Sequence, residues 1–419
     1  MTGRPAEALL LLAALCAVGC GPSESAVRPV SGLVFEEQPR SATGVQAREP
    51  RMVVRASGMI ALAQVHTEGA FEHDLVVYRS ESGGDVFGEP VAVDPGGGRV
   101  VAHGEGAPAF LQGARSQFHA VWIANRPGGG RVLQTARSKD FLHSFDEPVV
   151  ITTGSRGEPA FFDAAVLPSG QVAASWLARA KPGSSLPGTS SLLVSVAQGP
   201  GGAFGEPVVV ANDVCPCCRP ALLSGEDGQL YLAWRTTDAE DVRSMVVASS
   251  TDQGRTWSAP APIPGVGWKI KGCPHSGPSM AFHEGRLHVA WYSEGEGSPR
   301  LYWSRQDDQG GFTPARVLSA GVRDANHPFL GQVDGRLFAA FQARDSSAAG
   351  GWPTTGIFVT EIADDEVLAP VEVPTGDGTA SYPRLNALGA GRLLVAWTEH
   401  GEGDRQVMLA RARLEPAAH

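Results

Sequence analysis

The sequence predicts an all-β domain built from repeated antiparallel units of four strands. Three observations support this: short apolar segments alternate with turns containing Gly and Pro, a unit of nearly constant length recurs, and no long segment has a helical period. The composition agrees, because 52 glycines and 31 prolines among 419 residues supply many tight turns, while only 19% of the residues are charged. We expect residues 31–419 to form one domain.

Each predicted unit starts at a proline that precedes a short apolar strand. Seven prolines occupy this place: Pro50, Pro108, Pro159, Pro220, Pro278, Pro328 and Pro383. Successive members are 58, 51, 61, 58, 50 and 55 residues apart. This spacing fits one four-stranded blade per unit, so the series predicts a β-propeller with seven blades favoured.

The remaining strands of each unit follow in order. A second apolar strand, usually ending in Ala-Trp or a similar pair, is expected at 59–65, 118–122, 172–176, 230–234, 287–291, 337–341 and 393–397. A third is expected at 75–78, 132–135, 192–196, 245–248, 301–304, 357–360 and 407–410, and a fourth follows pairs such as Glu89-Pro90. The last unit reaches His419 without a fourth strand. Residues 33–37 are therefore expected to pair there, so that the N- and C-terminal strands close the ring and remove two exposed edges.

One turn carries a recognisable motif, S-x-D-x-G-x-T-W at Ser250–Trp257. Asp252 can accept hydrogen bonds from the backbone of its own turn, Gly254 allows a positive φ, and Trp257 anchors the turn against the sheet. The motif resembles the Asp-box, or bacterial neuraminidase (BNR) repeat, of the sialidase superfamily. The resemblance implies a β-propeller in which this turn is structural and lies far from the catalytic face. Sialidases have six blades, so six is the alternative to seven.

The start of the chain has the features of an export signal. Arg4 precedes an apolar run over residues 8–18 that is too short to span a bilayer as a stable helix, and small residues lead to Cys20. This arrangement resembles a lipoprotein signal, which implies a cleaved leader at 1–19, lipid on the Cys20 sulfur and a tether over 20–30. An ordinary secretory signal and an uncleaved anchor are the alternatives. We expect an exported, membrane-anchored bacterial lipoprotein, periplasmic or on the cell surface.

A propeller gathers the residues around the first prolines of its units at one mouth of its central channel. The expected members are Arg48, Glu49, Ala107, Glu158, Cys218, Arg219, His275, His327, Ser381 and Tyr382. Residues at the ends of second strands, such as Arg235 and Glu399, approach the same face. This mouth is therefore predicted to hold the functional site.

Three of these positions resemble sialidase motifs. Arg48-Glu49-Pro50 resembles the R-I-P motif, which implies that Arg48 binds a sialic acid carboxylate through its planar guanidinium. Glu158 resembles the Glu that activates the nucleophile, and Tyr382 resembles the nucleophilic Tyr, a known exception among glycosidases. Arg235 is a candidate second clamp arginine, and Glu399 is a further candidate ligand contact.

The general-acid Asp of the sialidases has no counterpart in this sequence. Ala107 stands where that Asp is expected, and Glu105 is the nearest carboxylate. Arg300 and Arg323 are the candidates for a third clamp arginine. Loss of the acid removes roughly two to four orders of magnitude from the rate. Catalysis in which Glu105 replaces the acid and binding without hydrolysis are therefore both open.

Four cysteines fall in two neighbouring loops between units: Cys215, Cys217, Cys218 and Cys273. An even number of cysteines in an exported protein indicates two disulfides that staple the loops. A bond between the adjacent Cys217 and Cys218 would be strained. The alternative is a metal site in which the thiolates and His275 bind Cu(I) or Zn²⁺, with His103 and His327 as possible further ligands.

The composition also bounds the function. The formal net charge of −10 and the absence of a basic run argue against nucleic acid as a partner. The first hypothesis is a lipid-anchored monomer that binds a glycan or other acidic ligand at the mouth and needs no cofactor. The second is an exo-α-sialidase that uses Tyr382 and the arginine clamp. The third is a metal-binding or purely structural propeller centred on the cysteines.

Overall fold

The computed structural model describes residues 28–29, 32–69, 73–94, 99–114, 116–152, 157–179, 190–212, 214–272, 274–345, 354–376 and 378–415. Within these ranges every regular element is a strand except η1, a short 3-10 turn at Gly104–Gly106. The predicted all-β class is confirmed. The predicted leader and the lipidated Cys20 lie outside the described residues. Among the described residues, no helix is long and apolar enough to cross a membrane.

Three sheets consist of four antiparallel strands that follow one another along the chain. The first contains β12 (Glu158–Val166), β13 (Val172–Arg179), β14 (Ser190–Val196) and β15 (Val208–Asn212). The second contains β16 (Ala221–Ser224), β17 (Leu230–Arg235), β19 (Met245–Ser250) and β20 (Ala261–Pro262). The third contains β22 (Ser279–His283), β23 (Arg286–Ser293), β24 (Arg300–Arg305) and β25 (Arg316–Val317). Each corresponds to one predicted unit.

Two further sheets add strands to the same plan. In one, β9 (Phe118–Asn125) pairs with β10 (Arg131–Ser138), β7 (Val100–Val101) and β8 (Ala109–Gln112), and β10 pairs with β11 (Val149–Val150). In the other, β26 (Val322–Val333), β27 (Arg336–Asp345), β28 (Gly356–Ala363) and β29 (Glu366–Ala369) follow in order, β30 (Val371–Glu372) pairs with β28, and β1 (Arg28–Pro29) pairs with β29. A separate small sheet joins β18 (Val242–Arg243) to β21 (Trp268–Lys269).

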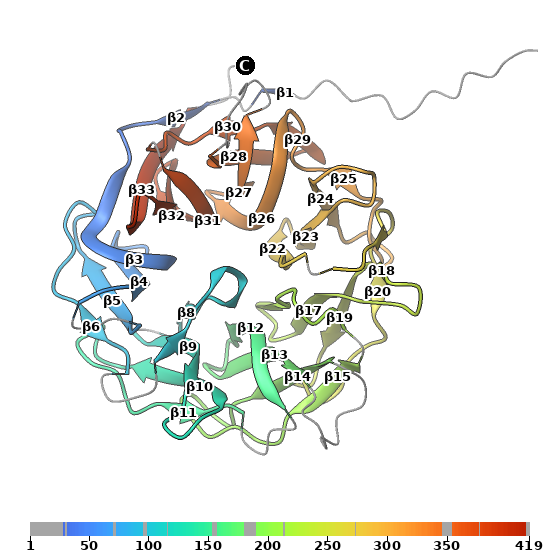
Figure 1. The fold of residues 1–419 in the computed structure, drawn as a ribbon, viewed down its shortest axis with the longest axis horizontal. Helices are drawn as coiled ribbons and strands as arrows, with labels where there is room; N and C mark the ends of the chain where they lie inside the picture. Colours follow the sequence, from blue (N-terminus) through green and yellow to red (C-terminus); the bar gives the residue numbers. More distant parts are fainter. Residues whose placement is uncertain are drawn as a thin grey trace, which may run out of the picture.

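The first and last units share one sheet. It contains β31 (Thr379–Gly389), β32 (Arg392–His400), β33 (Arg405–Leu414), β3 (Arg40–Val54), β4 (Ile60–His66), β5 (Leu75–Ser80) and β6 (Val91–Ala92). The first part of β3 pairs with β33 and its second part pairs with β4. β2 (Leu33–Phe35) also pairs with β33, as predicted for residues 33–37. Figure 1 shows the sheets following one another around a common centre, with the blue β2 and β3 beside the red β33.

The aromatic residue near the end of most predicted second strands anchors its sheet to the preceding one. Trp122, Trp176, Trp234 and Trp397 are at most 2% exposed. Trp122 of β9, for example, belongs to one apolar cluster with Ala63 of β4 and Val77 of β5. Full burial of a large apolar side chain stabilises the fold by about 1.5–3 kcal/mol. The recurring Ala-Trp pair therefore marks the interface between neighbouring sheets.

The Asp-box turn between β19 and β20 has the local hydrogen bonds predicted for it. Ser250 Oγ donates to Asp252 Oδ1 at 2.8 Å and accepts from Gly254 N at 2.9 Å. Asp252 also accepts from the Thr256 backbone N at 2.9 Å, and Trp257 Nε1 donates to the Gly254 carbonyl at 3.2 Å. Gly254 has a φ of 80°, as the turn requires.

Two other turns form related hydrogen bonds with a changed sequence. Ser80 Oγ accepts from Gly84 N at 2.9 Å, and Ser138 Oγ accepts from Leu142 N at 3.0 Å. In the first of these turns Ser82 takes the place of the Asp and accepts from a backbone N–H. A hydroxyl can replace a carboxylate as acceptor, so the same turn forms where the sequence no longer matches the Asp-box motif.

The pairing of β2 with β33 can be tested with two neighbouring substitutions. Leu33 is 8% exposed and belongs to the apolar cluster between β26–β28 and β31–β33, whereas Val34 is 36% exposed. Leu33→Ala is expected to lower the free energy of unfolding by about 2–3 kcal/mol, because it removes buried methyl groups. Val34→Ala should change it by less than about 0.5 kcal/mol. Urea unfolding measures both, and equal effects would contradict the observed strand orientation.

Candidate functional site

The loops that enter several sheets contain backbone that non-glycine residues rarely adopt. Glu49, His275, His327 and Tyr382 have φ angles of 60°, 50°, 52° and 54°. Strand pairing shifts register beside Glu49, His327 and Tyr382. Such bulges re-aim side chains, and non-glycine residues in the left-handed region cluster at functional sites. The repetition of this feature in separate sheets therefore marks one end of the molecule as the candidate site.

The side chains of Glu49, His275 and Tyr382 converge on one pocket, which we call the mouth pocket and which has a volume of about 350 Å³. It is lined by Arg48, Glu49, His103, Gly104, Glu105, Phe161, His275, Tyr382, His400 and Arg405. The lining comes from loops and strands that span almost the whole described chain. Arg48, Glu49, His275 and Tyr382, which the sequence analysis placed at one mouth, therefore lie together.

Glu105 holds the base of the mouth pocket together. This carboxylate is 7% exposed and accepts hydrogen bonds from Gly277 N at 2.8 Å and His327 Nδ1 at 2.7 Å. Arg219 Nε lies 3.5 Å from its second oxygen. Burial alone would raise the pKa of Glu105, but the His327 hydrogen bond and the Arg219 charge outweigh burial and lower the pKa to about 2. Glu105 is therefore a stable carboxylate, which does not suit its predicted role as replacement for the missing acid.

Glu49 is the carboxyl group whose surroundings favour a proton. It is 4% exposed, its Oε1 accepts from Gly104 N at 2.7 Å, and its buried Oε2 has no hydrogen-bond partner among the described residues. Burial raises the pKa of Glu49, although Arg51, the Gly104 hydrogen bond and Arg48 oppose this. No sequence motif marked Glu49 as an acid. The available signal was its place between Arg48 and a unit-starting proline.

Tyr382 lies beside both carboxyl groups. Its ring centroid is 4.4 Å from that of His327, and a Cβ added to Gly104 would collide with its hydroxyl. Burial raises the pKa of Tyr382, and the negative charges of Glu105 and Glu49 raise it further. The phenol therefore stays neutral and can donate a hydrogen bond into the mouth pocket.

Two arginines give the mouth pocket a positive edge. Arg48 and Arg405 both line it, and the buried Arg48 Nε has no hydrogen-bond partner among the described residues. Burial lowers the pKa of Arg48; Glu49 opposes this effect, and Arg405 adds to it because like charges repel. Among the described residues no ion pair joins either arginine to a carboxylate at 4.0 Å or less. An anion bound here would accept a hydrogen bond from Arg48 Nε and would reduce the repulsion between Arg48 and Arg405.

Three more arginines line a second hollow of about 240 Å³ in the centre of the sheets: Arg51, Arg219 and Arg384. Burial lowers the pKa of Arg51 to about 10 and that of Arg384 well below its ordinary value. Asp163 lies 3.4 Å from Arg219 and accepts from Leu222 N at 2.9 Å. Ala107, at the position of the missing acid, lines this hollow and not the mouth pocket.

Two residues predicted as ligand contacts have structural partners instead. Arg235 is 2% exposed, donates to the carbonyl of Tyr292 at 2.6 Å and does not line the mouth pocket. Glu399 accepts from Trp397 Nε1 at 3.1 Å and does not line the mouth pocket, whereas its neighbour His400 does. Successive strand residues point to opposite faces of the sheet. A prediction that is wrong by one position therefore selects Glu399 in place of His400 as the residue that faces the pocket.

Glu158, Arg300 and Arg323 do not line the mouth pocket either. Glu158 begins β12, and its Cα partner is Arg179 on β13. The predicted pairing of Glu158 with Tyr382 therefore lacks support, because the carboxyl groups that influence Tyr382 are Glu105 and Glu49.

The predicted cysteine group is divided. Cys215, Cys217 and Cys218 are buried in the apolar cluster between β12–β15 and β16–β19, and no disulfide joins them to one another. His275 lines the mouth pocket, and the group of candidate metal ligands among the described residues contains the three thiols without His275. Cys273 lies outside the described residues. The predicted ligand set is thus reduced to three thiols that lie within 4.8 Å of one another.

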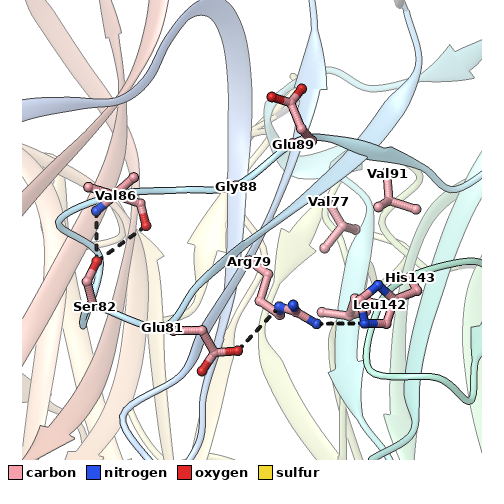
Figure 2. A pocket seen from close by; sticks show the side chains of 10 residues that line it. All are labelled: Val77, Arg79, Glu81, Ser82, Val86, Gly88, Glu89, Val91, Leu142 and His143. Atoms are coloured by element: carbon pink, nitrogen blue, oxygen red, sulfur yellow. Dashed lines mark hydrogen bonds and ion pairs between the residues drawn. The ribbon is translucent and has the colours of Figure 1, made fainter.

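A larger hollow of about 570 Å³ lies apart from the mouth pocket, beside the turns that follow β5 and β10. In Figure 2, Arg79 is paired with Glu81 at 3.3 Å and contacts His143, with Nη1 and Nε2 3.3 Å apart. Arg79 also donates to the Phe141 carbonyl at 2.9 Å. These contacts join the first two units at their turns, and none of the predicted site residues lies here.

No protein-family model matches the chain, and no curated protein sequence matches it. Solved structures do. A protein of unknown function from Dyadobacter fermentans is 16% identical with a TM-score of 0.53, over 92% of this chain and 100% of that one. A family-25 polysaccharide lyase, an ulvan lyase, is 10% identical with a TM-score of 0.54, over 91% and 94% of the two chains. The fold is of the β-propeller type.

Sialidases and a family-43 glycoside hydrolase are also among the similar structures. The Hadza microbial sialidase Hz136 is 14% identical with a TM-score of 0.49, over 85% of this chain and 76% of that one. The resemblance to the sialidases as a family rests on the sequence motifs alone.

The low pKa of Glu105 predicts that the free energy of unfolding depends on pH. Its pKa falls from 4.5 to about 2 on folding, so the unfolded chain binds more protons between these values. The stabilisation, about 3 kcal/mol, is present above pH 4.5 and is lost as the pH falls towards 2. Glu105→Gln should therefore be less stable than the wild type at pH 7, and the difference should shrink below pH 4.5.

Urea unfolding at a series of pH values measures this difference. Glu402→Gln, at an exposed position, serves as the control and should follow the wild type at every pH. A stability difference for Glu105→Gln that does not change with pH would contradict the ionised state of Glu105.

Proposed function

We propose that this protein is an exported, seven-bladed β-propeller that binds the acidic end of a glycan in the mouth pocket. The observation that carries the proposal is the Arg48 guanidinium, whose buried Nε has no partner among the described residues and which repels the neighbouring Arg405. A carboxylate or sulfate supplies both the acceptor and the charge that these arginines lack.

The size and lining of the mouth pocket suit a sugar. Ligand pockets in proteins usually occupy about 300–1,000 Å³, and this one, at about 350 Å³, fits one or two sugar rings. His103, His275, His400 and Tyr382 offer hydrogen-bonding groups around the two arginines. Phe161 offers an apolar face, packed against His103 with ring centroids 5.6 Å apart.

The fold supports the ligand class. The ulvan lyase of similar fold is bound to a glucuronate-containing, sulfated glycan, and the other similar structures include sialidases. The seven unit-starting prolines and the pairing of β2 and β3 with β33 support a ring of seven blades closed by the two ends of the chain. A lipid on Cys20 would hold this ring at a membrane as a monomer, with the mouth pocket open to glycans.

Titration calorimetry with defined sugars tests the proposal. 3′-Sialyllactose and a glucuronate-terminated oligosaccharide should bind, whereas lactose should not. Arg48→Ala should weaken acidic ligands about 10- to 100-fold, because a charge-assisted hydrogen bond contributes about 1.5–3 kcal/mol. Arg392→Ala, at the opposite end of β32 from His400, is the matched control and should bind normally. Equal affinity for lactose, or no effect of Arg48→Ala, would overturn the proposal.

A second candidate function is cleavage of the bound glycan. Tyr382 in its left-handed backbone lies beside Glu49, the carboxyl whose pKa burial raises. In the arrangement that the sialidase resemblance implies, Tyr382 attacks the sugar. Glu49, in place of the predicted Glu158 and Glu105, would supply or accept the proton.

Release of 4-methylumbelliferone from its sialoside tests this second function. Tyr382→Phe should abolish turnover, and Glu49→Gln should lower it about 100- to 10,000-fold, as expected for loss of a general acid–base group. Glu158→Gln should retain activity. Absence of turnover by the wild type at any pH would exclude sialoside hydrolysis and leave binding alone.

A further inference from the structure

We infer that Cys215, Cys217 and Cys218 form a binding site for one soft metal ion, with Cu(I) as the preferred occupant. The sulfur atoms have the spacing that such a site requires. Cys215 Sγ lies 3.6 Å from Cys217 Sγ and 3.6 Å from Cys218 Sγ, and all three lie within 4.8 Å of one another. Metal–sulfur bonds of about 2.3 Å place sulfurs about 3.8 Å apart at tetrahedral angles and about 4.0 Å apart in a trigonal three-coordinate site.

The chain forms this group in a short turn. Cys215 N donates to the Arg235 carbonyl at 3.0 Å, and the turn at Pro216-Cys217 follows directly. The three side chains are 0–2% exposed and belong to one apolar cluster. Soft thiolates in an apolar, water-poor site favour Cu(I) over hard cations that prefer oxygen ligands.

Two buried arginines provide the second observation. Arg235 and Arg243 are 2% and 7% exposed, and the Nε of each has no hydrogen-bond partner among the described residues. Arg243 Nη1 donates to Cys215 Sγ at 2.9 Å. Neither arginine has an ion pair with a carboxylate at 4.0 Å or less in the described part of the chain. Two buried cations of this kind require nearby negative charge.

Charge balance favours a monovalent ion. Three thiolates and one Cu(I) carry two net negative charges, which the Arg235 and Arg243 guanidiniums neutralise. Zn²⁺ with the same thiolates would leave one positive charge in an apolar region, at an energetic cost. Zn²⁺ also prefers a fourth ligand in a tetrahedral site. These considerations rank Cu(I) above Zn²⁺ for this group.

A metal bound to the three thiols would influence the central contacts of the molecule through the adjacent residue Arg219. Cys218 is followed by Arg219, which contacts Glu105 and Asp163 and donates to the Pro278 carbonyl at 3.0 Å. A metal that fixes the turn would also fix the position of Arg219. The thiols are buried and none of them lines the mouth pocket, so the metal is structural and makes no contact with the proposed glycan.

The test uses the full chain with Cys16→Ser, Cys20→Ser and Cys273→Ser, so that only the three thiols remain. Under anaerobic, reducing conditions this protein should bind one Cu(I) per molecule, measured by competition with a chromophoric Cu(I) chelator and by elemental analysis. A thiolate-to-copper charge-transfer band and a raised melting temperature should accompany binding. Cys217→Ser should reduce the affinity at least 100-fold, and circular dichroism checks that it folds.

A second variant tests the charge argument. Arg243→Gln retains the thiols and should weaken Cu(I) at least tenfold while affecting Zn²⁺ less, because the balancing charge is lost. Three free thiols without Cu(I) binding in the folded protein would overturn the inference. Absence of free thiols in the wild type purified without reductant, with no metal present, would also overturn it, because the sulfurs would then be in disulfides.

Discussion

The mouth pocket depends on one buried carboxylate. Glu105 accepts hydrogen bonds from Gly277, in the loop before β22, and from His327 in β26. It also pairs with Arg219, which lies just before β16. The same network continues outward, since the Tyr382 ring packs against the His327 ring in a tilted arrangement and Arg219 lies beside Asp163 of β12. Glu49 of β3 completes it by accepting from Gly104, next to Glu105. Every one of the seven repeat units contributes to this network, so it fixes the relative positions of loops that belong to different sheets.

The network also explains why strained backbone persists. Left-handed conformations cost about 1–3 kcal/mol each for non-glycine residues and are kept only where surrounding contacts determine them. Glu49, His327 and Tyr382 each have such contacts, through Gly104, Glu105 and Gln342 respectively. The strain therefore holds polar side chains over a common centre before any ligand arrives, and this preorganisation reduces the entropy lost on binding.

The sequence predicted the fold and the convergence of the loops better than the roles of individual residues. Repeat length and alternating apolar residues determine strands and their order, so the units and the β2–β33 pairing were accessible. His400, and not the predicted Glu399, lines the mouth pocket, because strand period does not reveal which face meets the pocket. The burial of Arg235 and the ionised state of Glu105 depend on residues far apart in the chain, which the local pattern does not contain. The place of His275 in the pocket lining likewise depends on distant residues.

The distribution of charge favours small acidic ligands over polyanions. The chain carries a formal net charge of −10, yet five arginines line the mouth pocket and the central hollow, against three carboxylates: Arg48, Arg51, Arg219, Arg384 and Arg405 against Glu49, Glu105 and Asp163. The remainder of the molecule is correspondingly more acidic. Such a surface repels an extended polyanion that must contact it at many points, while a recessed positive centre attracts a single carboxylate or sulfate. The contrast between an acidic exterior and a basic centre therefore supports the proposed binding of the end of an acidic glycan.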